Sequence, residues 1–95
     1  MTMRITITAR HCELPAGLEE RTRAVLERLS KVAGRPHDAR AIFGTDHGAS
    51  TVELRLHTAR GHVHVATASG DDHRSALDRA AAKVRRQLDK ARETR

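Results

Sequence analysis

The large apolar residues of this chain are few, but they recur at regular spacings, and these spacings restrict the fold more than any other feature. Apolar and polar residues alternate in segments 3–9 and 50–58, as in a strand with one buried face. In two longer segments, apolar residues recur every three or four positions, as on one face of an amphipathic helix. Only 38% of the 95 residues are hydrophobic, so the chain can bury one small core. We therefore expect a single domain over residues 1–95.

The boundaries of the predicted elements follow from residues that start or stop regular structure. A first helix should open at Leu14-Pro15 and end at Gly34-Arg35-Pro36, because Gly accepts a left-handed cap and Pro cannot continue the hydrogen bonds of a helix. Asp72 should cap a second helix over about 72–92. Strands are expected at 3–9, 38–44, 50–58 and 62–69.

The resulting β-α-β-β-β-α order predicts the fold class. Consecutive strands without a helix between them form an antiparallel meander, and two amphipathic helices can cover only one face of a sheet. We expect an α+β two-layer sandwich, a four-stranded sheet with two helices on one face. The facing of strand 62–69 stays open. A two-residue loop before it turns Val63 and Val65 inward, whereas a longer or bulged loop turns His64, Ala66 and Ala68 inward.

Charge indicates the class of partner. The chain carries 18 Lys and Arg against 12 Asp and Glu, a formal net charge of +6, and most of the bases are Arg. The planar Arg fork binds phosphate in a bidentate way, so we expect a polyanion as partner. A single Cys fits a reducing compartment, and no apolar run approaches the length of a membrane span. We expect a cytoplasmic protein without membrane attachment.

The second predicted helix carries the strongest candidate binding surface, which we call the basic strip. It consists of four cations at spacings of 4, 3 and 4 residues, Arg79, Lys83, Arg86 and Lys90. At about 100° per residue they share an arc of about 60°, opposite the apolar stripe of the helix, which consists of Leu77, Ala80, Ala81, Val84, Leu88 and Ala91. A phosphate backbone would relieve their mutual repulsion. Arg28 and Lys31 on the first helix are weaker candidates, because Glu20 and Glu27 interrupt the adjoining surface.

A nucleic-acid ligand would be recognised through its shape and its phosphates. Base-stacking platforms need aromatic side chains, and this chain has one Phe and no Tyr or Trp. Binding should therefore weaken steeply as the salt concentration rises.

Several stretches resemble one known family. The clearest is Gly70-Asp71-Asp72-His73-Arg74-Ser75-Ala76-Leu77-Asp78, continued by Lys83-Val84-Arg85-Arg86-Gln87-Leu88. Ile5-Thr6-Ile7, Glu13-Leu14 and Val52-Glu53-Leu54 support it. Together they resemble the ribosome hibernation-promoting factor and ribosome-associated inhibitor family, in its short, sigma-54 modulation protein-like form.

The resemblance implies a fold and a function. The family has the same β-α-β-β-β-α order, and its members bind the small ribosomal subunit in the decoding region and inhibit translation in starved or stationary cells. Lys83, Arg86 and Arg28 match basic positions of the family, and the rest of the basic strip extends that surface. The implied partners are the small subunit and its ribosomal RNA, without a cofactor or small-molecule substrate. The resemblance also favours the second facing of strand 62–69. Because no sequence follows residue 95, we expect no dimerisation domain.

Two other functions stay open. A three-stranded sheet with two helices also serves to bind free double-stranded RNA. His57, His62 and His64 cluster about a hairpin, and imidazoles hold zinc or copper, so a His-dependent metal-binding stress protein is the third hypothesis. We expect no enzyme, because the sequence offers no paired acids, no triad and no partner base for Cys12.

Overall fold

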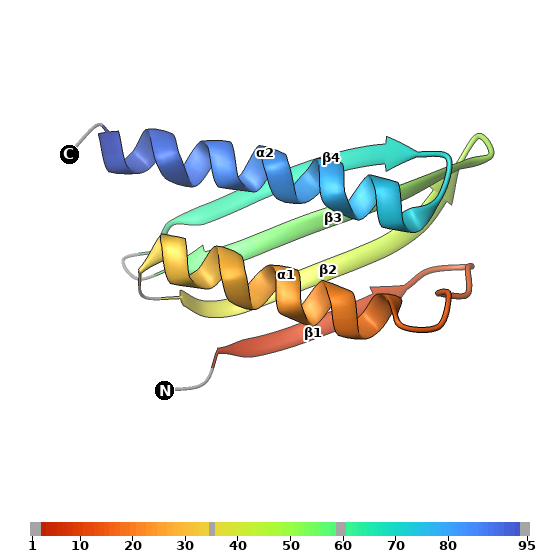
Figure 1. Ribbon diagram of the computed structural model, residues 1–95, viewed down its shortest axis with the longest axis horizontal. Coiled ribbons are helices and arrows are strands. Elements are labelled where there is room, and N and C mark those ends of the chain that lie inside the picture. The colour runs from red at the N-terminus through yellow and green to blue at the C-terminus, as the bar shows by residue number, and fades with distance from the viewer. Residues whose placement is uncertain (1–2, 35, 59–60, 94–95) are drawn as a thin grey trace.

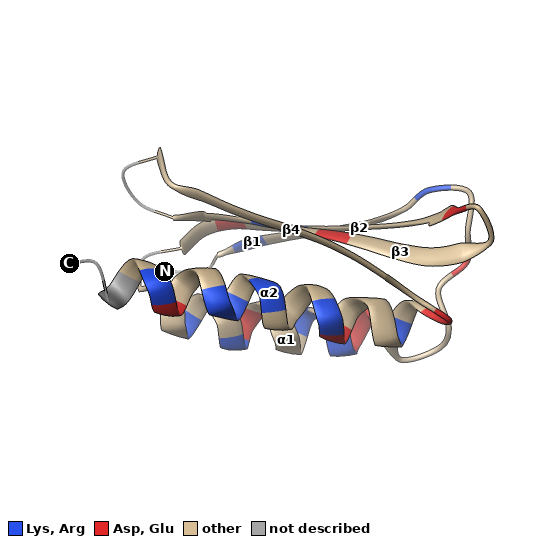
Figure 2. Ribbon diagram, turned by 90° about the horizontal axis from the view of Figure 1, so that it is seen from above, with Lys and Arg blue, Asp and Glu red and all other residues tan. Residues whose placement is uncertain are grey.

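Six elements make up the computed structural model, which describes residues 3–34, 36–58 and 61–93. They are β1 (Arg4–Ala9), α1 (Leu18–Ala33), β2 (Pro36–Asp46), β3 (Ala49–Thr58), β4 (Val63–Gly70) and α2 (His73–Glu93). The strands form one sheet in the order β1-β2-β3-β4, and both helices cover the same face of it (Figures 1 and 2). The predicted α+β two-layer sandwich is confirmed.

The sheet is mixed. β1 and β2 pair in parallel, as a helical crossover between them requires, whereas β2, β3 and β4 form the predicted antiparallel meander. β4 consequently runs in the same direction as β1. Each of these two strands is followed by a helix that returns across the sheet, so α1 and α2 lie side by side and run in the same direction (Figure 1).

The hairpin between β2 and β3 is tighter than the sequence suggested. Both strands continue to the pair Asp46 and Ala49, so the turn consists of His47 and Gly48 alone. Their φ angles are 50° and 81°, and two residues with positive φ match a type I′ turn, whose twist suits a hairpin. The expected loop from Gly44 onward is therefore largely strand.

The start of α1 differs from its predicted position. The helix begins at Leu18, because Gly17 adopts a left-handed conformation with φ of 82°, and Pro15 disfavours a helical conformation in the residue before it. Leu14 nevertheless packs against the core from the preceding segment. The predicted end is confirmed at Gly34, whose φ is 94° and whose N–H donates to the carbonyl of Ser30 at 3.2 Å.

The facing of β4 is settled in favour of the longer loop. The N–H of Thr58 donates to the carbonyl of His62 at 2.9 Å, which leaves more than two residues between the strands. Residues 59 and 60 of the expected turn lie outside the described part of the chain. Ala66 and Ala68 are buried beneath the helices, and Val65 is 40% exposed on the open face.

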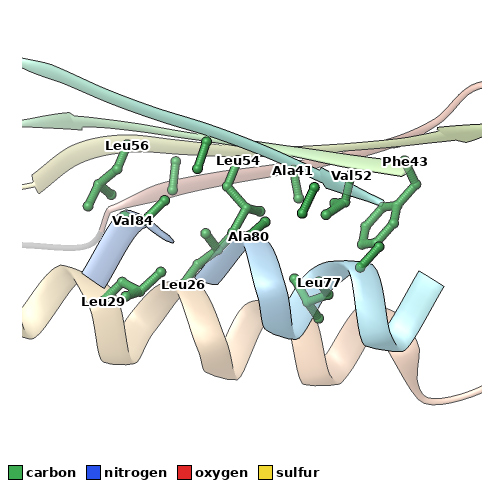
Figure 3. Close-up of a cluster of buried hydrophobic side chains, with 14 of the residues drawn as sticks. Leu26, Leu29, Ala41, Phe43, Val52, Leu54, Leu56, Leu77, Ala80 and Val84 are labelled. Atoms are coloured by element: carbon green, nitrogen blue, oxygen red, sulfur yellow. The ribbon is translucent and has the colours of Figure 1, made fainter. Parts of the chain in front are cut away.

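The core lies between the sheet and the helices, and the strands contribute side chains of different size to it (Figure 3). The central strand β3 supplies large residues, whereas β2 and β4 supply mainly alanines on their inward faces: Val52, Leu54, Leu56, Ala39, Ala41, Ala66 and Ala68. Small side chains on β4 let α2 lie close to this strand. One flank of α2 therefore lies next to the edge of the sheet that β4 forms.

Candidate nucleic-acid interface

Asp72 fixes the start of α2. Its Oδ1 atom accepts a hydrogen bond of 2.7 Å from the N–H of Ser75, which satisfies one of the unpaired donors of the first turn. The same hydrogen bond holds the pKa of Asp72 below its ordinary value of 3.8. The predicted cap is confirmed.

His73 anchors the first turn of α2 to the sheet. Its side chain is buried, its Nε2 atom lies 2.8 Å from the carbonyl oxygen of Gly44, and its ring meets Phe43 edge-to-face at 5.7 Å. The sequence did not single out this residue as part of the core, because a polar residue beside a helix cap is usually exposed.

The burial of His73 reveals how α2 is oriented. Its buried residues are His73, Ala76, Leu77, Ala80, Val84 and Leu88. The apolar stripe expected from the sequence instead omitted His73 and Ala76 and included Ala81, which is half-buried. Ala91, the last residue of the expected stripe, is exposed near the end of α2. The buried arc is therefore turned about the helix axis toward β4, and the basic strip does not lie opposite the core.

A row of hydrogen bonds joins α2 to the outer edge of β4, and we call it the edge ladder. Three side chains spaced four residues apart each donate to a β4 carbonyl: Arg79 Nη1 to Ser69 at 2.9 Å, Lys83 Nζ to Thr67 at 2.8 Å and Gln87 Nε2 to Val65 at 2.7 Å. The expectation that the basic strip points straight away from the sheet is thus wrong for Arg79 and Lys83. Both residues remain exposed, and both keep further N–H donors for another ligand.

Two nearby acids of α2, Asp78 and Asp89, are bound by arginines outside the basic strip. Asp78 binds Nη2 of Arg21 on α1 through both of its oxygens, at 2.9 and 3.1 Å. Asp89 binds Nε of Arg85 at 3.2 Å. Lys90 aside, no member of the basic strip forms an ion pair with a carboxylate among the described residues. The charges of Arg79, Lys83 and Arg86 are therefore not neutralised by these acids.

Arg28 and Lys31 are exposed on α1 but do not join the basic strip. Because the helices are parallel and Arg21 meets Asp78, Arg28 lies level with Arg85, on the flank of α1 that faces α2. Arg79 and Lys83 lie on the opposite flank of α2, over β4. The predicted site residues therefore occupy two parts of one helical layer.

Charge differs between the two faces of the molecule (Figure 2). Lys and Arg follow both helices, interleaved with acids, whereas the sheet carries few charged residues. On the open face of the sheet, Arg40 pairs with Asp38 at 3.6 Å and Arg55 with Glu53 at 2.6 Å. The helical layer is consequently the better candidate surface for a polyanion.

The structure also bears on the metal and membrane expectations. His57 pairs with Val63 and His64 with Leu56, so the two histidines lie on opposite faces of the sheet and do not form a cross-strand pair. Within residues 3–34, 36–58 and 61–93, no three His, Cys, Asp or Glu are placed to share a metal ion. None of the helices in these ranges combines the length and the apolar character that a membrane crossing needs.

Comparisons with known proteins support this description. The sequence model of the family described as sigma 54 modulation protein / S30EA ribosomal protein matches residues 5–95. No curated protein matches the chain. A ribosomal subunit interface protein from Coxiella burnetii has a similar structure, with a TM-score of 0.85 and 23% identity over 96% of this chain and 99% of that one. The N-terminal domain of Protein Y from Thermus thermophilus is similar with a TM-score of 0.76 and 18% identity, over 90% and 96% of the two chains. Because the family model spans nearly the whole sequence, the chain belongs to the sigma 54 modulation protein / S30EA ribosomal protein family.

Proposed function

We propose that this protein is a ribosome-associated factor that binds the small ribosomal subunit and inhibits translation in starved or stationary cells. Its ligand is ribosomal RNA, its binding surface is the outer side of the helical layer, and its role is binding without catalysis in the cytoplasm. The residues that neutralise RNA phosphates are Arg28, Lys31 and the basic strip, Arg79, Lys83, Arg86 and Lys90.

Family membership supports the choice of the ribosome. The family is described as ribosomal, and one structural neighbour is named a ribosomal subunit interface protein. Its fold aligns with this chain over 96% of the residues, so the helical layer is present in both.

The charge of the basic strip is the observation that carries the proposal. Two of the acids beside it, Asp78 and Asp89, are bound by Arg21 and Arg85, and the strip itself runs about 16 Å along α2 at 1.5 Å per residue. Arg79 and Lys83 are already held by the edge ladder, so binding costs less side-chain entropy than it would for freely rotating cations.

The absence of an exposed Phe, Tyr or Trp ring supports recognition through phosphates. Phe43 is the single Phe of the chain and is fully buried, and the sequence has no Tyr or Trp. Stacking of bases on Phe, Tyr or Trp is therefore not available, and most of the affinity should come from charge. Such affinity falls linearly with salt on logarithmic axes, with a slope set by the number of phosphates contacted.

Two matched double variants test the proposal. Arg28→Gln with Arg86→Gln removes two charges from the helical layer, and Arg4→Gln with Arg55→Gln removes two from the open face of the sheet. We expect purified wild-type protein to co-sediment with small subunits at low salt. The first variant should bind more weakly, with a log-log salt slope reduced by about one unit per lost phosphate contact. The second should bind like the wild type.

Two outcomes would contradict the proposal. If the sheet variant loses as much affinity as the helix variant, the helical layer is not the interface. If an isolated RNA duplex competes the protein off small subunits at equal nucleotide concentration, the chain is a general double-stranded RNA binder instead.

A further inference from the structure

β4 is an edge strand with a free side. In the sheet order β1-β2-β3-β4 it pairs with β3 alone. In an antiparallel pair, every second residue turns its N–H and C=O away from the neighbouring strand. In β4 these residues include Val65, Thr67 and Ser69, whose carbonyls accept from α2 instead. An edge of this kind is a template on which another strand can pair.

The sequence of β4 offers no protection of its own. Residues 63–70 read Val-His-Val-Ala-Thr-Ala-Ser-Gly, without Lys, Arg, Asp, Glu or Pro. Natural edge strands usually carry such residues to prevent pairing with other chains. Val63 and Val65 are in addition 46% and 40% exposed on the open face of the sheet, and they are the exposed large apolar residues of the described chain.

The side chains of the edge ladder, which come from α2, cover the free edge of β4. Four residues of a helix advance about 6 Å, and two residues of a strand advance about 6.7 Å. Because these lengths are similar, side chains at every fourth helix position can reach every second carbonyl of the strand for three successive hydrogen bonds. Arg79, Lys83 and Gln87 do so, with donor–acceptor distances from 2.7 to 2.9 Å. Two of the three also place positive charge at the edge.

We propose that Arg79, Lys83 and Gln87 close the edge of β4 against strand addition, and that without them β4 pairs with β4 of a second copy of this chain. A second copy is the fitting occupant because two antiparallel β4 strands are related by a two-fold axis and can share their free carbonyls and N–H groups. Such pairing would also place the exposed valines of both copies on one continuous sheet face. The edge ladder thus has a function that does not depend on the ribosome.

Variants on the two sides of α2 separate the hydrogen bonds from the charge. Arg79→Ala, Lys83→Ala and Gln87→Ala together remove all three rungs and two charges. The control, Arg74→Ala with Arg86→Ala, removes two charges from the same helix, and neither residue donates a hydrogen bond to β4 among the described residues. We expect the molar mass of the triple variant in light scattering to double with concentration, while the control stays at the mass of one chain, 10.5 kDa.

A rescue substitution identifies the strand that pairs. Val65→Lys, added to the triple variant, places on the pairing edge of β4 a charged residue of the kind that blocks edge strands, and it should restore the mass of one chain. Lys83→Met alone keeps the side-chain length but removes the central donor. It should self-associate in the same way at higher concentration, and it guards against loss of folding in the triple variant.

The proposal is overturned if Lys83→Met and the folded triple variant stay monomeric across the concentration series. It is also overturned if the control associates as strongly as the triple variant, because charge alone would then be responsible. These measurements contain no ribosomes, so their outcome is separate from that of the proposed function.

Discussion

The Nε2 atom of His73 lies 2.8 Å from the carbonyl oxygen of Gly44, so the first residue of α2 is bonded to the C-terminal part of β2. A carbonyl only accepts hydrogen bonds, and Nε2 must therefore carry the proton. The same ring meets Phe43 edge-to-face. One side chain thus ties the start of the helix to the sheet by a polar and an aromatic contact.

Replacing His73 should destabilise the fold. His73→Ala removes a buried hydrogen bond and an aromatic contact and leaves a cavity, which together cost about 2–4 kcal/mol. Urea unfolding followed by circular dichroism measures the free energy of unfolding. His62→Ala is the matched control, because His62 is exposed and its replacement should cost less than about 0.5 kcal/mol. Equal values for the two variants would contradict the role of His73.

The cap at Asp72 should make stability depend on pH in acid. The pKa of Asp72 is lower in the folded state than its ordinary value of 3.8, so the charged cap stabilises the fold above that pH. This contribution is lost as the pH falls below 3.8 through the folded pKa. Asp72→Ala should lower the urea midpoint at neutral pH, and the difference from wild type should shrink on acidification. Asp71→Ala is the control for loss of a nearby charge. A difference that is constant from pH 7 to pH 2 would rule out the charged cap.

The alanines of β4 should not tolerate enlargement. Ala66 is buried below α2, and Ala66→Leu forces the helix away from the sheet at a cost of about 1–3 kcal/mol. Thr67→Leu adds a large side chain at the next position, on the exposed face, and should change the free energy of unfolding by less than about 0.5 kcal/mol. Urea unfolding of both variants measures the contrast. The opposite ranking would mean that β4 faces the other way.

Periodicity predicted the fold because its elements each bury one face. The alternation in β3 and the three-to-four spacing in α1 are direct consequences of burial, so the class and order of the elements follow from the sequence. Two details depend on backbone conformation instead. The left-handed Gly17 moved the start of α1, and the loop after Thr58 decided the facing of β4.

The candidate site was predicted in part for a similar reason. The spacing of the basic strip follows from the sequence, and its members are exposed as expected. The contact of Arg79 and Lys83 with β4 cannot be predicted from the sequence in this way, because the buried side of a helix is inferred from the positions of its apolar residues. In α2 the buried direction also depends on His73 and Ala76, which lie outside the expected apolar stripe. Gln87 carries no charge, and its four-residue spacing from Lys83 is the one sequence signal that it belongs to the edge ladder.

Arg21 is a cation of the helical layer that Asp78 withholds from other ligands. The two oxygens of Asp78 lie 2.9 and 3.1 Å from Nη2 of Arg21, and both side chains are partly exposed, at 39% for Arg21 and 50% for Asp78. An ion pair with this exposure contributes little to stability, in the range of about 0–1 kcal/mol. Its main effect is to neutralise charge on the surface that we propose for RNA.

Asp78→Asn should therefore strengthen ribosome binding while leaving the fold almost unchanged. The substitution removes a negative charge from the helical layer and releases Arg21 to reach a phosphate, which should steepen the log-log salt slope by about one unit. Sedimentation with small subunits across a salt series measures this slope. Asp46→Asn is the matched control, because it changes the net charge equally at the exposed turn between β2 and β3. If both variants gain the same affinity, net charge rather than the helical layer governs binding, and if Asp78→Asn binds more weakly, the ion pair itself helps to shape the interface.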